Sequence, residues 1–167
     1  MEHFYTLQGE GYHSGKAAYF IRLGGCDVGC VWCDVKDSWD AAAHPLMTTS
    51  EITKQAAQHK GRIAVVTGGE PAMHELTALC DALHNEGFKV HLETSGAHPL
   101  SGHIDWVTLS PKKFKAPLND CMICADELKV VIYHSSDFAW AEDHAAMVRP
   151  DCRLYPVSYT HLTLPTI

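Results

Sequence analysis

Three cysteines within eight positions are the feature that most constrains this chain. Cys26, Cys30 and Cys33 lie in the segment "RLGGCDVGCVWCD", where neighbouring glycines let the backbone turn tightly around a bound group. A structural zinc site usually takes four protein ligands, often as two separated pairs. The next pair of cysteines, Cys121 and Cys124, follows only much later in the chain. The spacing therefore favours a site whose thiolate ligands all come from one loop.

A cubane iron–sulfur cluster suits such a loop, because three thiolates can hold three of its irons and leave the fourth open. An open iron can bind and activate a small molecule, as the open position of a catalytic zinc ion does. Two other interpretations stay open at this point. One is a zinc ion completed by Asp34 or a histidine, and the other is a set of buried cysteines that bind nothing.

Composition and charge narrow the class of protein. With 167 residues and 46% hydrophobic content, the chain is long enough for one domain with a full core. A net charge of −7 argues against a general nucleic-acid binder. No run is apolar enough to span a membrane and the N-terminus does not resemble a secretion signal, so we expect a cytoplasmic protein. In a reducing compartment its seven cysteines are expected as ligands, reactive thiols or buried residues rather than disulfides.

Short apolar runs alternate with helical patterns along the chain. We expect strands at residues 17–23, 62–67, 88–94, 105–110, 128–133 and 152–157, and helices at 48–61, 71–87 and 135–148. This alternation favours parallel strands with right-handed crossovers, in an open sheet or a barrel. The groups "GGC", "GGEP", "ETSG" and "SPKK" follow four of the strands. Because function collects at the carboxyl ends of parallel strands, these loops are expected to form one site.

Two motifs resemble those of the radical S-adenosylmethionine (SAM) superfamily. One is Cys-x3-Cys-x2-Cys with an aromatic residue, Trp32, before the last cysteine, and the other is "TGGEP" at 67–71. The resemblance implies that Cys26, Cys30 and Cys33 hold a [4Fe–4S] cluster whose open iron is chelated by SAM. It also implies that an electron from the cluster cleaves SAM to a 5′-deoxyadenosyl radical, which abstracts hydrogen from the substrate.

Nearly the whole chain, roughly residues 4–155, resembles the 7-carboxy-7-deazaguanine synthase family of the queuosine pathway. The matching segments are "FYTLQGEGYHSGKAAYFIRLGGCDVGCVWCD", "VTGGEP", "ETSG", "LSPK" and "DELKVVI". The resemblance implies an α/β fold, a compact and modified parallel-strand partial (β/α) barrel, and a homodimer. The implied enzyme is a carbon–nitrogen lyase that converts 6-carboxy-5,6,7,8-tetrahydropterin to 7-carboxy-7-deazaguanine with loss of ammonia. A flavodoxin-like or other reductant would supply electrons, and no nucleic-acid or membrane partner is implied.

The resemblance also assigns roles position by position, with no catalytic side chain beyond the cluster and substrate residues. Glu10 and Glu93 are further expected pocket groups. The positions matched to SAM binding are Trp32, Cys33, Asp34, Gly69, Ser110, Pro111 and Lys112. The positions matched to substrate binding are Leu7, Gln8, Gly9, Arg22 and Thr67. Arg22 is expected to pair with the substrate carboxylate, which suits a planar guanidinium.

Several of these residues also have purely structural interpretations. Arg22 could face solvent from an apolar strand. Thr67 could serve only the β-propensity of its strand, and Glu70 could cap the helix that follows it.

Two features depart from the family. Val35 stands where many members have a threonine that helps to bind Mg²⁺, and an aliphatic side chain cannot ligate this oxygen-seeking ion. A direct magnesium ligand is therefore missing. Beyond residue 156 the resemblance ends, so we expect a core domain at 1–156 and an unrelated tail at 157–167, as in a truncated gene product.

Two other functions remain as alternatives. The first is a radical SAM activating enzyme that abstracts hydrogen from a glycine of another protein. The second is a non-catalytic module that binds zinc or an iron–sulfur cluster.

Overall fold

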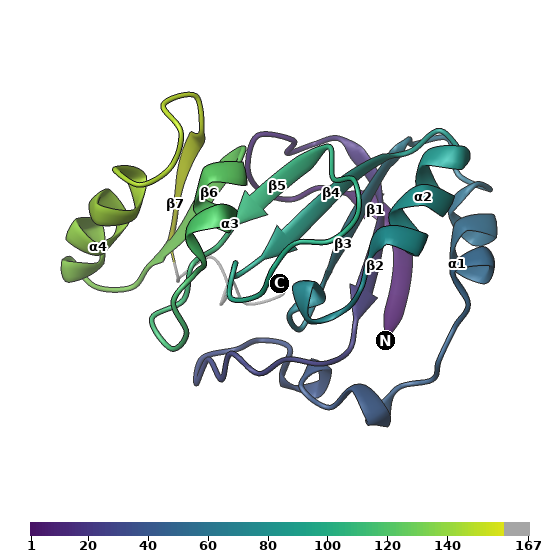
Figure 1. Ribbon diagram of the computed structural model, residues 1–167, viewed down its shortest axis with the longest axis horizontal. Coiled ribbons are helices and arrows are strands. Elements are labelled where there is room, and N and C mark those ends of the chain that lie inside the picture. The colour runs from purple at the N-terminus through teal and green to yellow at the C-terminus, as the bar shows by residue number, and fades with distance from the viewer. Residues whose placement is uncertain (159–167) are drawn as a thin grey trace, which may run out of the picture.

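Seven strands form one sheet whose spatial order follows the chain order, in a computed structural model that describes residues 1–158 (Figure 1). The first two strands are antiparallel, and every later strand is parallel to the one before it. The two outer strands do not pair, so this is the expected α/β partial barrel, left open. The strands are β1 (Glu2–Leu7), β2 (Ala17–Leu23), β3 (Ile63–Gly68), β4 (Lys89–Thr94), β5 (Trp106–Leu109), β6 (Glu127–Ile132) and β7 (Arg153–Ser158).

Helices lie in the connections between the parallel strands. Helix α1 begins with the expected capping box, in which Glu51 N–H donates to the Thr48 hydroxyl while the Glu51 carboxylate accepts from Thr48 N–H. Across residues 1–158, no helix has the length and apolar character needed to cross a membrane. The helices are α1 (Thr49–Ala56), α2 (Thr77–Asn85), α3 (Asn119–Cys124) and α4 (Ser136–Ala145), with 3-10 helices η1 (Lys36–Ser38), η2 (Ala41–Ala43) and η3 (Pro71–Met73).

One face of the sheet packs against the helices. Because strand side chains alternate between the faces, every second residue of β2, β3 and β4 points toward α1 and α2. A second apolar cluster joins β5 and β6 to α3 and α4. Burial of aliphatic side chains of this kind stabilises a fold by about 1.5–3 kcal/mol each. The strand residues in these clusters are Tyr19, Ile21, Ala64, Val66, Val90, Leu92, Leu109, Leu128 and Val130.

The opposite face of the sheet, here called the inner face, carries polar and charged side chains toward the strands' carboxyl ends. Arg22 on β2 is in register with Thr67 on β3, and Glu93 on β4 is in register with Thr108 on β5. Lys129 occupies an inner-face position on β6. The connection from β2 to α1, residues 24–48, runs along the lower edge of Figure 1, below the arrowheads of β2 and β4.

The sequence predicted the six parallel-sheet strands to within one residue at each end. It did not predict the antiparallel edge strand β1 or the short helix α3. The prediction of one helix over 71–87 was wrong, because the segment divides into η3 and α2. His74 lies between them in extended conformation with its ring Nε2 2.7 Å from Gly24 O. The Glu75 carboxylate then accepts a hydrogen bond from Thr77 N–H, in the first turn of α2.

The predicted boundary after residue 156 falls inside β7. Val157 and Ser158 pair with Val131 and Ile132 of β6 and so belong to the sheet. The rest of the expected tail, residues 159–167, lies outside the described residues.

The buried imidazole of His91 predicts acid sensitivity. Burial, helped by the charge of His13, lowers its pKa to about 4, although Asp105, Asp126 and Glu93 act in the opposite direction. The unfolded chain takes up this proton near pH 6.5, so stability falls as the pH drops from about 6.5 to about 4. Over that window we expect the free energy of unfolding of the apoprotein to fall by on the order of 2 kcal/mol more than that of His91→Gln.

Denaturant titrations at several pH values measure this difference. If the free energy of unfolding fell equally with pH in wild type and His91→Gln, His91 would not be the source of the acid sensitivity.

Candidate active site

A cavity of about 360 Å³ opens at the carboxyl ends of the strands. It lies between the loop after β2 and the inner face of the sheet, with wall residues from every strand from β2 to β7 except β5, whose place is taken by the segment that follows it. Most of the predicted site residues share it. They are Arg22, Cys26, Cys30, Trp32, Cys33, Asp34, Thr67, Gly69, Ser110 and Lys112.

The loop that carries the three cysteines is held by backbone hydrogen bonds at its start. Gly25 N–H donates to Ser38 O at 2.6 Å, and Cys26 N–H donates to Trp39 O at 3.3 Å. A local turn then forms where Cys33 N–H donates to Cys30 O at 3.0 Å. Between the first two cysteines, Gly29 adopts φ +75°, a left-handed conformation that glycine reaches without the steric penalty of a Cβ atom.

The glycine-rich turn after β3 touches this loop directly. Gly69 N–H donates to Leu23 O at 3.0 Å, and Glu70 N–H donates to Gly25 O at 2.8 Å. A Cβ atom on Gly69 would lie 2.3 Å from Gly25 O and 2.9 Å from the Cys26 Cβ. Glycine is therefore required here by the close approach of two backbones, beyond any contact it makes with a cofactor.

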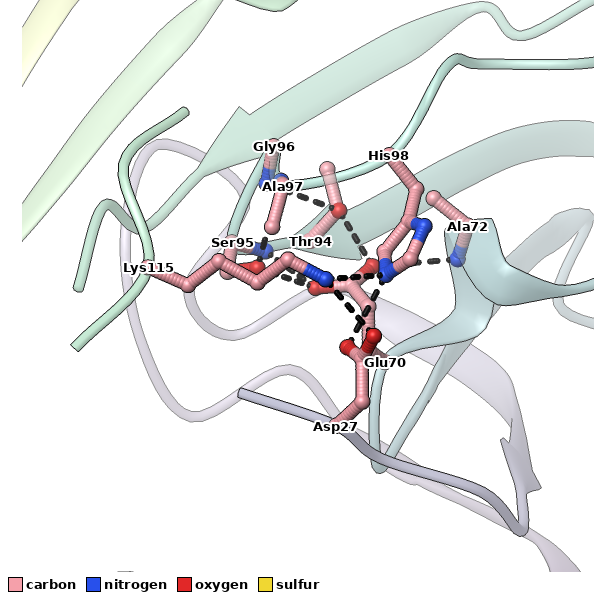
Figure 2. A network of polar contacts seen from close by, with 9 residues as sticks. All are labelled: Asp27, Glu70, Ala72, Thr94, Ser95, Gly96, Ala97, His98 and Lys115. Atoms are coloured by element: carbon pink, nitrogen blue, oxygen red, sulfur yellow. Dashed lines mark hydrogen bonds and ion pairs between the residues drawn. The ribbon is translucent and has the colours of Figure 1, made fainter. Parts of the chain in front are cut away.

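A buried carboxylate, Glu70, fastens this turn to the end of β4 (Figure 2). Its side chain is 1% exposed. One oxygen accepts from Ala72 N–H at 3.0 Å and from the Thr94 hydroxyl at 2.5 Å, and the other accepts from Ser95 N–H at 2.8 Å and from the Ser95 hydroxyl. Glu70 therefore caps η3, as its structural interpretation proposed, and also joins two of the loops that form the cavity.

Charged groups of the inner face line the deep side of the cavity. Glu93 accepts hydrogen bonds from Gln8 Nε2 at 3.0 Å and from the Thr67 hydroxyl at 3.1 Å, one on each carboxylate oxygen. Lys129 Nζ lies 3.1 Å from Glu10 Oε2. The side chain of Lys129 is largely buried, which by itself lowers its pKa, but the carboxylates of Glu93 and Glu10 outweigh burial and raise it. The lysine is therefore held as an ammonium group.

A second buried lysine, Lys112, lies nearer the cysteines. Burial lowers its pKa to about 8, and the charge of Lys129 adds to this effect. Its Nζ lies 2.5 Å from the Ser110 hydroxyl and 5.5 Å from the centre of the Trp32 ring.

Arg22 lines the cavity, and its guanidinium lies beside one carboxylate and one aromatic ring. Its Nε lies 3.2 Å from Glu2 Oε1, but among residues 1–158 this atom makes no hydrogen bond. The guanidinium also lies 5.9 Å from the centre of the Phe4 ring. The geometry thus leaves planar hydrogen-bond donors available beside Thr67, its neighbour in the sheet.

The chemistry of the three thiols decides which group they can hold. Burial raises the pKa of Cys26 and of Cys30, so a ligand that binds thiolates must displace protons from both. Within residues 1–158, no three His, Cys, Asp or Glu side chains converge as the ligands of a single metal ion would. A zinc ion completed by Asp34 or a histidine is therefore not preformed in this part of the chain. As donors, the three free thiols of one loop suit a cubane cluster, in which each thiolate would bind a different iron.

Four predicted residues lie outside the wall of the main cavity. Leu7 is exposed at the end of β1, and Gly9 follows in the adjoining loop. Pro111 lines a second cavity of about 370 Å³, which shares Trp32, Lys112 and Val131 with the first. Gln8 is absent from the main cavity wall but reaches it through Glu93.

Lys129 is a charged cavity residue that sequence reasoning did not single out. Glu127 and Lys129 alternate with apolar residues along β6. This alternation could have predicted that both charged side chains lie on one face of the strand, opposite the core. Thr94 and Ser95 were seen only as part of a polar strand end, and their tie to Glu70 needed the fold.

Comparisons with known proteins agree with this geometry. The profile of the radical SAM superfamily matches residues 20–115, from β2 to the segment after β5. Fold, cysteine loop and profile together define a radical SAM protein.

The 7-carboxy-7-deazaguanine synthase of Flavobacterium psychrophilum is 54% identical over 155 residues, which cover 93% of this chain and 73% of the relative. That of a Synechocystis species is 51% identical over 154 residues, covering 92% and 74%. The crystal structure of QueE from Escherichia coli superposes with a TM-score of 0.81 at 33% identity, covering 93% of this chain and 81% of that one. The chain therefore belongs to the 7-carboxy-7-deazaguanine synthase family of radical SAM lyases, which confirms the resemblance seen in the sequence.

The four hydrogen bonds of Glu70 predict a large cost for its removal. Glu70→Ala leaves buried donors of Ala72, Thr94 and Ser95 unpaired, and we expect it to lower the free energy of unfolding by about 2–4 kcal/mol. Glu70→Gln keeps one acceptor oxygen and should cost less. Chemical denaturation of the apoprotein measures both.

Glu75→Ala is the matched control, because Glu75 is exposed and accepts from the Thr77 N–H and hydroxyl. If Glu70→Ala and Glu75→Ala lowered the free energy of unfolding equally, burial of the Glu70 network would contribute no extra stability.

Proposed function

We propose that this protein converts 6-carboxy-5,6,7,8-tetrahydropterin to 7-carboxy-7-deazaguanine with loss of ammonia, in queuosine and 7-deazapurine biosynthesis. The observation that carries the proposal is one cavity that joins three thiols to a charged inner face. Family membership over nearly the whole chain supports the same reaction. Neither a glycyl-radical activating enzyme nor a non-catalytic metal module is favoured by any of these observations.

Cys26, Cys30 and Cys33 would hold the [4Fe–4S] cluster. When bound, the cluster and SAM supply the 5′-deoxyadenosyl radical that abstracts hydrogen from the substrate. Trp32, Asp34, Gly69, Ser110 and Lys112 line the same cavity and would position SAM.

The second cavity suits the adenosine part of SAM. It adjoins the main cavity through Trp32 and Lys112, and Pro111 forms part of its wall. Phe114, Tyr133 and Trp140 give it aromatic surfaces on which a purine can stack. If this cavity binds adenosine, Pro111 contacts the cofactor, as the family resemblance implies.

The pterin fits the inner face by charge. Its carboxylate would pair with the guanidinium of Arg22, in a charge-assisted contact that can be bidentate. Its aminopyrimidine edge presents adjacent N–H donors, which a carboxylate such as Glu93 can accept. Gln8 and Thr67 already fix the Glu93 carboxylate, whose oxygens retain free lone pairs.

The protein's own contribution is placement. Residues of the inner face hold the pterin so that one C–H bond faces the cofactor, and a fixed geometry of this kind lowers the entropic cost of reaction. The largely buried Lys129 ammonium, beside Glu10 and Glu93, is available to donate a proton to the departing amine.

Val35 lines the cavity at the position where a family threonine would ligate Mg²⁺. We therefore propose that any bound Mg²⁺ is held by substrate oxygens and water rather than by this side chain. A flavodoxin-like reductant, a homodimeric state and a cytoplasmic location complete the proposal.

Product formation from the carboxypterin, followed by mass spectrometry under anaerobic conditions, tests the proposed reaction. In Arg22→Ala we expect kcat/KM to fall roughly 10- to 100-fold, the effect of losing one charge-assisted contact, with cluster content unchanged.

Arg62→Ala is the control, because this arginine lies at the amino end of β3 and contacts only local carbonyls of His59 and Gly61 among its hydrogen bonds. Loss of the cluster in Arg22→Ala would refute a substrate role for Arg22. A reconstituted protein that forms no deazapurine would refute the proposed reaction.

A further inference from the structure

The stretch between the first two cysteines carries a charged residue that contacts two other loops. Asp27 follows Cys26 directly, and its Oδ1 lies 2.9 Å from His98 Nε2 while its Oδ2 lies 2.6 Å from Lys115 Nζ (Figure 2). Lys115 Nζ is also 3.1 Å from the same His98 nitrogen. The three side chains therefore form one compact cluster on the outer side of the cysteine loop, and none of them lines the main cavity.

The partners of Asp27 come from loops that also build the cavity. His98 lies in the loop after β4, shortly beyond Ser95, which binds the Glu70 carboxylate. Lys115 follows β5 and forms an isolated antiparallel bridge with Lys112. Asp27 thus connects the cysteine loop to the ends of two neighbouring strands.

These contacts hold Cys26 from both sides. On one side, Gly25 O accepts from Glu70 N–H, and Glu70 in turn binds Ser95. On the other side, Asp27 binds His98, three residues beyond Ser95. The contacts therefore close a ring around the first cysteine. Val28 and Cys30 also pack against Ala97 in the same loop.

We propose that Asp27, His98 and Lys115 form a clamp of polar contacts that holds the cysteine loop in its cluster-binding conformation before a cluster is present. Asp27 is then a positioning residue for Cys26 and Cys30. This inference rests on the proposed role of the three thiols as cluster ligands.

The physical reason lies in the cost of ordering a flexible loop. A loop with glycines on both sides of its first cysteine loses much backbone freedom when it closes around a ligand. Contacts that fix it in advance remove part of that cost from the binding step. Single ion pairs at this degree of exposure are weak, with side chains 41% exposed for Asp27 and 36% for Lys115. The clamp takes its geometry from the two partners that one carboxylate binds.

The chain contains a matched control at the other end of the sheet. Asp105 pairs with His84 at 2.7 Å and with Lys89 at 2.7 Å, the same three residue types in a similar arrangement. These residues lie near the amino ends of β4 and β5, away from the cysteines. Lys89→Met therefore removes an equivalent ion pair without touching the cysteine loop.

The test compares anaerobically reconstituted wild type with Lys115→Met, Asp27→Asn, Lys115→Arg and Lys89→Met. The rate of iron release to a chelator is measured together with the electron paramagnetic resonance spectrum of the reduced cluster and the melting temperature of each apoprotein. We expect Lys115→Met and Asp27→Asn to release iron roughly fivefold faster than wild type, as the loss of one partly exposed ion pair implies. Lys89→Met should release iron at the wild-type rate, and Lys115→Arg should release it nearly as slowly as wild type.

Equal iron release from Lys115→Met and Lys89→Met would overturn the clamp. So would a fall in the melting temperature of the Lys115→Met apoprotein, beyond that of Lys89→Met, large enough to account for faster release. A wild type that binds iron but forms no deazapurine would refute the proposed reaction while leaving the clamp testable by iron release. A wild type that takes up no iron would overturn both.

Discussion

The buried carboxylate of Glu70 is the interaction on which the site depends. Four hydrogen bonds satisfy it, and they come from the turn after β3 and from the end of β4. Its backbone N–H meanwhile reaches Gly25 at the start of the cysteine loop. A charge with so little access to water is stable only when fully bonded, so the three segments must stay together for the fold to tolerate it.

The strand order explains why one sheet carries both the cysteine loop and the charged side chains of the inner face. Each parallel strand lies beside the next in sequence, so successive loops meet at one end of the sheet. The inner-face side chains just below those loops are Arg22, Thr67, Glu93 and Lys129. The thiols thus belong to the loops, and the side chains proposed to bind substrate belong to the strands. The strands thus form a rigid scaffold for the proposed substrate site, while the loop above them accepts the cluster.

Much of this arrangement could be predicted from sequence because period-two patterns and strand-end motifs are local signals. The parallel strands, the capping box at Thr48 and the sharing of one cavity by Arg22, Thr67 and the cysteines were predicted correctly. The break between η3 and α2 was not, since it follows from a contact between His74 and Gly24 that lies outside the helical pattern. The partners of Asp27 could not be predicted from the sequence either, because only the folded sheet brings His98 and Lys115 close to it.

The three thiols are proposed above all to hold a cluster with one iron left for SAM. Anaerobic reconstitution with iron and sulfide, followed by reduction in the presence of SAM, tests it most directly. We expect about four irons and four sulfides per chain, together with formation of 5′-deoxyadenosine. Stoichiometric zinc in place of iron, with no 5′-deoxyadenosine, would contradict it.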